Sequence, residues 1–422
     1  MMDLQTRFHR LWTGEDSTHS REHHPFAHLD VFEEVSRGVG FYKAFVNLCV
    51  VDTDDGAVLI DTGAFAPILH QASFQAVRGW TSKRVHTAIY THGHVDHAYG
   101  LPPFLEEAAH KGWSRPRIIG HECVAHRMQR YVETNSYNAI INTRQFGLPV
   151  PWPTEYILPT QSYASSLVIE VGGTRFELHH ARGETDDATW VFLPQRKVLC
   201  TGDLFIWASP NAGNPQKVQR YCIEWARALR AMAAENPELL LPGHGLPIYG
   251  AEKVQTALLD TAKYLEIIYQ QTLAMLNEGA TIYDIIQAIQ IPAELAERPF
   301  LQPVYDEPEF VARNIYRCLA GWYTGVPSEL KPAPPSQQAR EIAELAGGVH
   351  KLLARADALL EAGDVRMACH LVDWSIEVAP HSAEAHQLRA RVYAQRGTEA
   401  LSTMSKGIFN AAHRESSKRG AK

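Results

Sequence analysis

Cysteine, long apolar runs and excess charge are all scarce in this sequence, and each scarcity excludes a class of protein. The six cysteines are scattered with no CxxC pair, which favours free thiols in a reducing compartment over a disulfide framework. No apolar run reaches the roughly 18 residues of a membrane helix, and the polar first 30 residues do not resemble a secretory signal. A net charge of −7 gives no electrostatic basis for binding nucleic acid or an anionic membrane. We therefore expect a cytoplasmic protein that binds neither.

The composition and the pattern along the chain predict two or three domains, the first of them mixed α/β. With 422 residues, 45% hydrophobic and 21% charged, the chain can form more than one soluble globular core. Expected strands cover 45–51, 57–61, 166–171, 174–179, 189–193 and 197–200, and expected helices cover 67–77, 101–110, 122–134 and 216–236. The turn signal Asp54-Asp55-Gly56 joins the first two strands into a hairpin.

Beyond residue 253 the pattern is helical, with almost no β-like alternation. Helices are expected at 253–277, 281–289, 308–322 and 336–362, with a proline-rich linker at 332–335. Residues 350–397 have the spacing of one tetratricopeptide-like helix pair, which is too short for a peptide-binding array and favours packing or dimerisation. The basic tail, residues 405–422, is expected to fray. The predicted parts are therefore 1–252, 253–404 and 405–422.

The most informative stretch is Thr91-His92-Gly93-His94-Val95-Asp96-His97, which directly follows a strand-like segment. Histidine is the commonest metal ligand, and a neighbouring carboxylate suits a borderline ion such as Zn²⁺. In an extended turn the side chains at positions i and i+2 point the same way, so the first two histidines can hold one ion while the residues after them reach a second. The alternative is a histidine-rich surface loop, which this spacing after a strand makes much less probable.

Further acids and a histidine follow other apolar segments, as a site with two ions requires. They stand in Gly183-Glu184-Thr185-Asp186-Asp187, Thr201-Gly202-Asp203 and Pro242-Gly243-His244-Gly245. A glycine beside Asp203 and beside His244 lets the backbone approach a metal closely. Within the first of these turns, Glu184 has Asp186 and Asp187 as rival ligands.

Together with the turn Asp61-Thr62-Gly63, these motifs resemble the metallo-β-lactamase superfamily, whose fold is an αβ/βα sandwich with a two-metal site at one edge. Most members have a metal-binding histidine just before the strand 189–193, where this chain has Ala188. Glu184, 19 residues before Asp203, instead resembles the alkyl sulfatase branch, in which a glutamate completes the shell of the first metal. The helical half is similar to the alkyl sulfatase dimerisation domain at 264–273, 277–279, 316–327, 347–348 and 362–364. The resemblance implies an α/β sandwich followed by an all-α dimerisation domain, and hence a homodimer.

The resemblance also implies two Zn²⁺ ions per chain and a role for each motif residue. Seven residues form the expected ligand set: His92, His94 and Glu184 for the first ion, Asp96, His97 and His244 for the second, and Asp203 bridging both. Asp96 and Asp203 are the expected catalytic carboxylates, and Asp61 is expected to hold a ligand histidine or its loop. Two such ions lower the pKa of a bridging water toward ~7 and make hydroxide available at neutral pH.

The chain departs from the alkyl sulfatase pattern where that family handles its substrate. No arginine stands at the family position after the bridging acid, and Phe310-Val311 replaces a family His-Asn pair. Four candidates could contact the anion instead, or could be plain surface residues: Asn138, Arg144, Lys217 and Arg220. Four apolar residues are candidates to line a pocket, with core packing as the alternative: Phe205, Ile206, Trp207 and Phe310.

The leading hypothesis is a dinuclear zinc hydrolase that uses a metal-bridging hydroxide to cleave a sulfuric ester, or a related small-molecule ester, with a hydrophobic group. One alternative is another hydrolase of the same fold, acting on a lactone, thioester, β-lactam or phosphodiester. Another is a non-catalytic dimeric scaffold that binds metal. Seven potential ligands argue against the scaffold, because structural zinc is typically closed with four.

Overall fold

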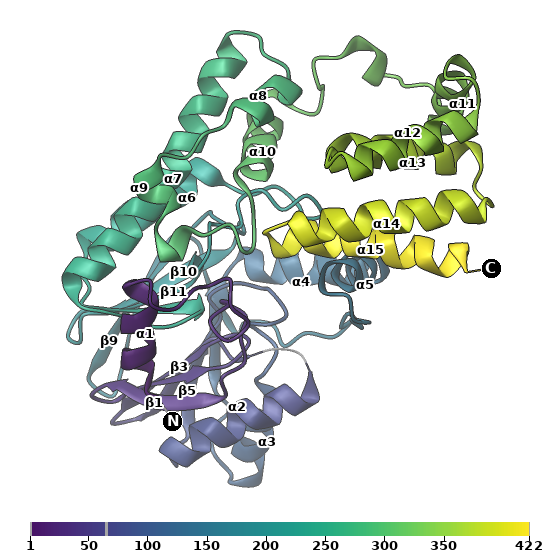
Figure 1. The fold of residues 1–422 in the computed structure, drawn as a ribbon. Coiled ribbons are helices and arrows are strands. Elements are labelled where there is room, and N and C mark those ends of the chain that lie inside the picture. The colour runs from purple at the N-terminus through teal and green to yellow at the C-terminus, as the bar shows by residue number, and fades with distance from the viewer. Residues whose placement is uncertain (1, 64–65, 422) are drawn as a thin grey trace. The chain divides into compact units, whose positions relative to one another are not determined.

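The computed structural model describes residues 2–63 and 66–421 and divides into two compact units. The first unit comprises residues 1–135, 152–279 and 284–319, and the second comprises 136–151, 280–283 and 320–422. Figure 1 draws both units and labels many of their helices and strands. Among the described residues, no helix has both the length and the apolarity needed to cross a membrane.

Two β-sheets form the centre of the first unit. The seven-stranded sheet has the order β1 (Val31–Ser36), β2 (Val39–Lys43), β3 (Leu48–Thr53), β4 (Gly56–Ile60), β5 (Val85–Ile89), β6 (Arg117–His121) and β7 (Gln161–Tyr163). The six-stranded sheet has the order β13 (Ile248–Tyr249), β12 (Leu239–His244), β11 (Val198–Ile206), β10 (Ala188–Leu193), β9 (Thr174–Ala181) and β8 (Ser166–Val171). In the first sheet, β4 to β7 pair in parallel, so their carboxyl ends meet at one edge.

Helices cover these sheets and complete the αβ/βα sandwich. The first unit contains α1 (Leu4–Trp12), α2 (Pro67–Trp80), α3 (Pro102–His110), α4 (Cys123–Glu133), α6 (Cys222–Ala234), α7 (Ala251–Asn277), α9 (Ala293–Ala296), η1 (Pro299–Leu301) and, apart from its last residue, α10 (Pro308–Ala320). Val77 of α2, Phe104 of α3 and Met128 of α4 are buried in one core with Leu59 of β4 and Ala88 of β5. This core fixes the strand ends that carry the histidine run.

The second unit is entirely helical among its described residues. It contains α5 (Asn135–Phe146), apart from its first residue, with η2 (Pro327–Glu329), α11 (Pro335–Leu345), α12 (Val349–Glu361), α13 (Val365–Val378), α14 (Ala383–Glu399) and α15 (Thr403–Gly420), while α8 (Ile282–Ala288) spans residues of both units. Leu353 of α12, Val372 of α13 and Val392 of α14 share one buried core. The mixed α/β domain followed by an all-helical region is thus confirmed.

Several local predictions need correction. The basic tail does not fray: α15 begins at an N-cap, Ser402, and His413 donates through Nδ1 to the carbonyl of Ala390, 2.9 Å away. The single helix expected at 336–362 is broken at Gly347 and Gly348, whose φ angles of 88° and 110° no L side chain adopts readily. In the division into compact units, α7 and most of α10 lie in the unit that contains the sheets, and the domain boundary expected at residue 253 stays a prediction.

The helix expected at 216–236 begins only at Cys222. Residues just before it are drawn into tertiary hydrogen bonds: Asn314 donates to the carbonyl of Arg220 at 2.9 Å, and Gln219 donates to the carbonyl of Asn314 at 3.1 Å. Residues 207–221 therefore form an irregular loop that runs from β11 to α6.

Candidate metal centre

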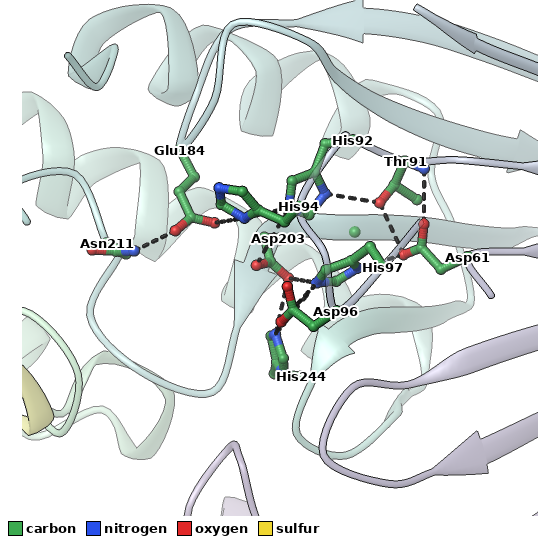
Figure 2. Close-up of polar contacts among 12 residues, drawn as sticks. Asp61, Thr91, His92, His94, Asp96, His97, Glu184, Asp203, Asn211 and His244 are labelled. Atoms are coloured by element: carbon green, nitrogen blue, oxygen red, sulfur yellow. Dashed lines mark hydrogen bonds and ion pairs between the residues drawn. The ribbon is translucent and has the colours of Figure 1, made fainter. Parts of the chain in front are cut away.

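The residues expected to bind metal come together at strand ends of both sheets (Figure 2). Asp61 follows β4 and the histidine run follows β5, while Glu184 follows β9, Asp203 lies within β11, and His244 is the last residue of β12. Their ligand atoms form two groups, each with all atoms within 4.8 Å of one another: His92, His94, Glu184 and Asp203, and then Asp96, His97 and His244.

The first group offers two neutral imidazoles beside two carboxylates. His92 Nε2 lies 2.8 Å from His94 Nδ1, and Glu184 Oε2 lies 3.9 Å from the same His94 atom. Burial, and then the neighbouring His97, lowers the pKa of His92 to about 4, and burial lowers the pKa of His94 well below its usual value. Both rings are therefore held in the neutral form that binds a metal.

In the second group, the Nε2 atoms of two histidine rings face each other. His244 Nδ1 lies 2.7 Å from the carbonyl of Phe45, and His97 Nδ1 lies 2.7 Å from the Asp61 carboxylate, so each Nδ1 donates. With Nδ1 bound in this way, each ring turns its Nε2 inward, and these two atoms are 3.4 Å apart. Burial lowers the pKa of His97, but the carboxylates of Asp203, Asp61 and Asp96 outweigh it and raise that pKa well above its usual value, so a bound cation would take the place of a proton there. Asp96 Oδ2 lies 3.4 Å from His244 Nε2. Two inward-facing imidazole nitrogens beside a carboxylate fit a divalent cation.

Asp203 lies between the two groups and presents one oxygen to each. Its Oδ2 is 3.8 Å from His92 Nε2, while its Oδ1 is 3.3 Å from His97 Nε2 and 3.6 Å from His244 Nε2. Oδ1 is also a buried atom without a hydrogen-bond donor among the described residues. A buried carboxylate oxygen in this condition is costly unless a cation neutralises it.

Two glycines make this approach possible. A Cβ on Gly243 would lie 2.2 Å from Asp203 Oδ1, and a Cβ on Gly202 would lie 2.6 Å from the hydroxyl of Thr91. Gly202 also has a φ of 50°, which favours glycine. The strands β11 and β12 can therefore bring Asp203 against the histidine run only with glycine at both positions.

Asp61 holds the histidine run in place through three hydrogen bonds. Its carboxylate accepts from the backbone N–H of Thr91 at 2.8 Å, from the Thr91 hydroxyl at 2.9 Å and from His97 Nδ1 at 2.7 Å. The φ of Asp61 is 60°, an uncommon conformation for a residue other than glycine. The contacts of this one strained residue thus determine both the loop and the orientation of a ligand ring.

The three acidic residues in the turn after β9 have different partners. Asp187 is fully buried and accepts from the backbone N–H of Gly93 at 2.9 Å and from Arg127 Nε at 2.9 Å. Asp186 accepts from the same arginine. Only Glu184 reaches the first group, with its Oε1 bound by the amide of Asn211 and its Oε2 turned toward His94. The rivals of Glu184 thus support the loop between the histidines.

Comparison with known proteins agrees with this geometry. Residues 42–244 match the family model of the metallo-beta-lactamase superfamily, and residues 281–419 match that of alkyl sulfatase dimerisation. The first of these regions is a metallo-β-lactamase superfamily domain. Within it, the chain resembles the alkyl sulfatase branch.

Two curated relatives illustrate that resemblance. The chain is 26% identical over 377 residues to a linear primary-alkylsulfatase of Pseudomonas sp., covering 82% of this chain and 70% of the relative. It is 24% identical to an (R)-specific secondary-alkylsulfatase of Pseudomonas sp., over 86% of this chain and 58% of the relative. The solved structure of the stereoselective inverting sec-alkylsulfatase Pisa1 from Pseudomonas sp. superposes with a TM-score of 0.82 at 22% identity, over 91% of this chain and 65% of that chain. That superposition shows the shared fold.

The four candidates for anion contact lie in different parts of the chain, and only some of them have contacts near the ligand groups. Arg220 is buried and its guanidinium contacts Glu184, with Nη2 3.5 Å from Oε1 and Nη1 donating to the main-chain carbonyl. Lys217 lies with Nζ 5.7 Å from the centre of the Trp152 ring. Asn138 and Arg144 both lie on α5, in the second unit, and their role stays a prediction.

The apolar pocket candidates prove to be mainly core. Phe205, Ile206 and Trp207 are at most 4% exposed, so they pack inside the first unit, whereas Phe310 is half-buried. Three contributors to the site were missed from the sequence: Asn211, Arg127 and the carbonyl of Phe45. No short motif marks them, since they reach the site from 27 to 199 residues away along the chain.

Proposed function

We propose that this chain is a two-metal hydrolase that cleaves a sulfuric ester of a hydrophobic alcohol. The observation that carries the proposal is the position of Asp203, which turns one oxygen to each of two ligand groups. A single structural ion would need neither the second group nor a carboxylate between them. The names of the similar proteins, which are alkylsulfatases, support the choice of ester.

The donor set fits two Zn²⁺ ions, because histidine nitrogens and carboxylate oxygens are the ligands that zinc prefers outside all-cysteine sites. When bound, two such ions supply a water of lowered pKa as the nucleophile and a positive field for the developing negative charge. His92, His94 and Glu184 would hold one ion, and Asp96, His97 and His244 the other. Asp203 would contact both.

Hydrogen bonds from neighbouring groups fix the tautomers of two ligand histidines and the orientation of Glu184. The Phe45 carbonyl and the Asp61 carboxylate fix the tautomers of His244 and His97, so that Nε2 of each ring faces inward. Asn211 and Arg220 both hold the Oε1 side of Glu184. Because that oxygen is occupied, Oε2 is the one left facing His94.

Lys217 is the candidate that best suits the non-reacting oxygens of the sulfate. Burial, and then the nearby Arg220, lowers its pKa to about 7, against the opposing effect of the carboxylates of Glu184 and Asp96. One of those carboxylates belongs to each ligand group, so the ammonium lies within electrostatic reach of both. An anionic ester bound there would favour the charged lysine.

We also propose that the active form is a homodimer, since residues 281–419 match the alkyl sulfatase dimerisation family. Light scattering coupled to size-exclusion chromatography of the full chain tests this. A mass near twice 47.2 kDa is expected, and a mass of 47.2 kDa at micromolar concentration would reject it.

A substrate panel on zinc-loaded protein tests the proposed activity. We expect release of inorganic sulfate from dodecyl sulfate to exceed hydrolysis of a lactone, nitrocefin, an acyl thioester and a phosphodiester. Asp203→Asn should abolish that release, while Asp54→Asn, a charge change at an exposed hairpin turn, should leave it intact. Preference for another ester would replace the proposed substrate class. Full sulfate release by Asp203→Asn would reject the two-metal mechanism.

A further inference from the structure

Three aromatic rings gather on one side of His244. Phe26 packs edge-to-face on the His244 ring with centroids 4.6 Å apart, and Phe45 lies 5.7 Å from the same ring. Tyr305 packs edge-to-face on Phe26 at 4.6 Å, and Phe26 stacks on Phe45 at 5.4 Å. In Figure 2, His244 lies on the side of Asp96 and Asp203, apart from Glu184 and Asn211. The three rings, here called the aromatic wall, therefore border the second ligand group.

The aromatic wall is not sealed inside the core. Phe26, Phe45 and Tyr305 are all half-buried, so each keeps part of its ring surface exposed. Half-exposed aromatic surface beside a cluster of polar ligands is the composition of a small-molecule site.

A buried lysine holds two of these rings in place. Lys43 Nζ donates to the carbonyl of Ala27 at 2.8 Å, to that of Pro25 at 3.3 Å and to that of Ala44 at 2.6 Å. One ammonium thus ties the strap, residues 24–28, to the turn that carries Phe45. Such an arrangement fixes the Phe26 ring, because carbonyls on both sides of it are held.

The strap also lies outside both matched families. These cover residues 42–244 and 281–419, so Phe26 is supplied by a part of the chain that neither family model describes. Phe26 nevertheless contacts a residue of the ligand set directly.

We propose that the aromatic wall is the subsite for the apolar organic group of the ester, and that Phe26 of the strap is a specificity-determining residue. The inference rests on the proposed function for the identity of the reacting group. An unbranched alkyl chain that extends from the ligand groups past His244 would lie against Phe26. Each methylene it buries there strengthens binding, up to about fourfold.

Binding of alkane-1-sulfonates tests the subsite without any turnover. Sulfonates keep the anionic head and lack the scissile ester oxygen, so calorimetry on zinc-loaded protein measures binding alone. We expect decanesulfonate to bind the natural protein at least about 10-fold more tightly than butanesulfonate. Phe26→Ala should reduce that ratio about fivefold or more, while Phe26→Leu should keep most of it.

The matched control is Phe32→Ala. Phe32 lies on the edge strand β1 and is also half-buried, but its ring packs on Trp80, with the ring centroids 5.6 Å apart. It should leave the ratio unchanged, and zinc content should be equal in all variants. An unchanged ratio in Phe26→Ala, or no chain-length preference in the natural protein, overturns the inference. A protein that shows the preference but releases no sulfate loses the proposed function and retains the subsite.

Discussion

Replacing Asp61 by asparagine separates orientation of the site from its ligands, because Asp61 touches a ligand without being one. The carboxylate accepts three hydrogen bonds, of which the bond from His97 Nδ1 is the shortest at 2.7 Å. Asparagine has almost the same shape but only one accepting oxygen. If that oxygen keeps the N–H of Thr91, the amide NH₂ faces His97, and two donors oppose each other.

The loss expected from this change follows from the lost bond. A hydrogen bond to a charged group contributes about 1.5–3 kcal/mol, and the His97 ring then loses the partner that fixed its tautomer. The affinity for the second zinc should fall about 10- to 100-fold, with a smaller effect on the first. His97 is itself fully buried, so its ring cannot turn outward to water to recover the bond.

Competition against a chromophoric zinc chelator measures the two affinities in one titration. Asp54→Asn, in the exposed turn after β3, is the matched control for the loss of one carboxylate charge. If Asp61→Asn bound two zinc ions as tightly as the natural chain, the proposed role of Asp61 would be wrong. It would also be refuted if both ions were lost equally in a protein that remained folded by circular dichroism.

Three further predictions follow from single contacts. Gly243→Ala should weaken zinc binding more than it lowers the free energy of unfolding, because the added methyl group would lie 2.2 Å from Asp203 Oδ1. Overpacking alone costs about 1–3 kcal/mol of stability. Titration with a chelator measures the zinc affinity, and urea unfolding measures the stability. Asn211→Ala should lower affinity at the first ion about 10-fold by freeing Glu184 Oε1, and unchanged affinity would show that Arg220 alone holds that side chain. Burial, against a weaker opposing effect of Asp30, lowers the pKa of Lys43 from 10.5 to about 7. Between these two pH values Lys43 is protonated in the unfolded chain and largely neutral in the folded chain, so the free energy of unfolding rises with pH. Relative to Lys43→Met, the natural protein should gain up to about 1.4 kcal/mol per pH unit in urea unfolding between pH 7 and 10, and parallel curves would contradict this.

The sequence was most informative where the chemistry is local. The histidine run lies within seven residues directly after a strand, so spacing alone brought its side chains together, and the structure has them at the end of β5. The hairpin between β3 and β4 was equally local: Thr53 pairs with Gly56 across the predicted turn.

Where partners are distant in the chain, the sequence left the choice open. Nothing local separates Glu184 from Asp187, and the difference comes from Arg127, 60 residues earlier, which pairs with the latter. In the same way, the run after Asp203 reads as apolar, but only packing reveals that Phe205 is core while Phe26, far upstream, borders His244. Tertiary contacts, which periodicity does not encode, decide both cases.

Titration of metal-free protein with zinc, with sulfate release from dodecyl sulfate as the readout, tests whether hydrolysis requires both ions. Because Asp203 turns one oxygen to each ligand group, both ions should be needed for turnover. We expect little sulfate release at one equivalent of zinc and a plateau at two equivalents per chain. Full activity at one equivalent, or no sulfate at any zinc concentration, would contradict it.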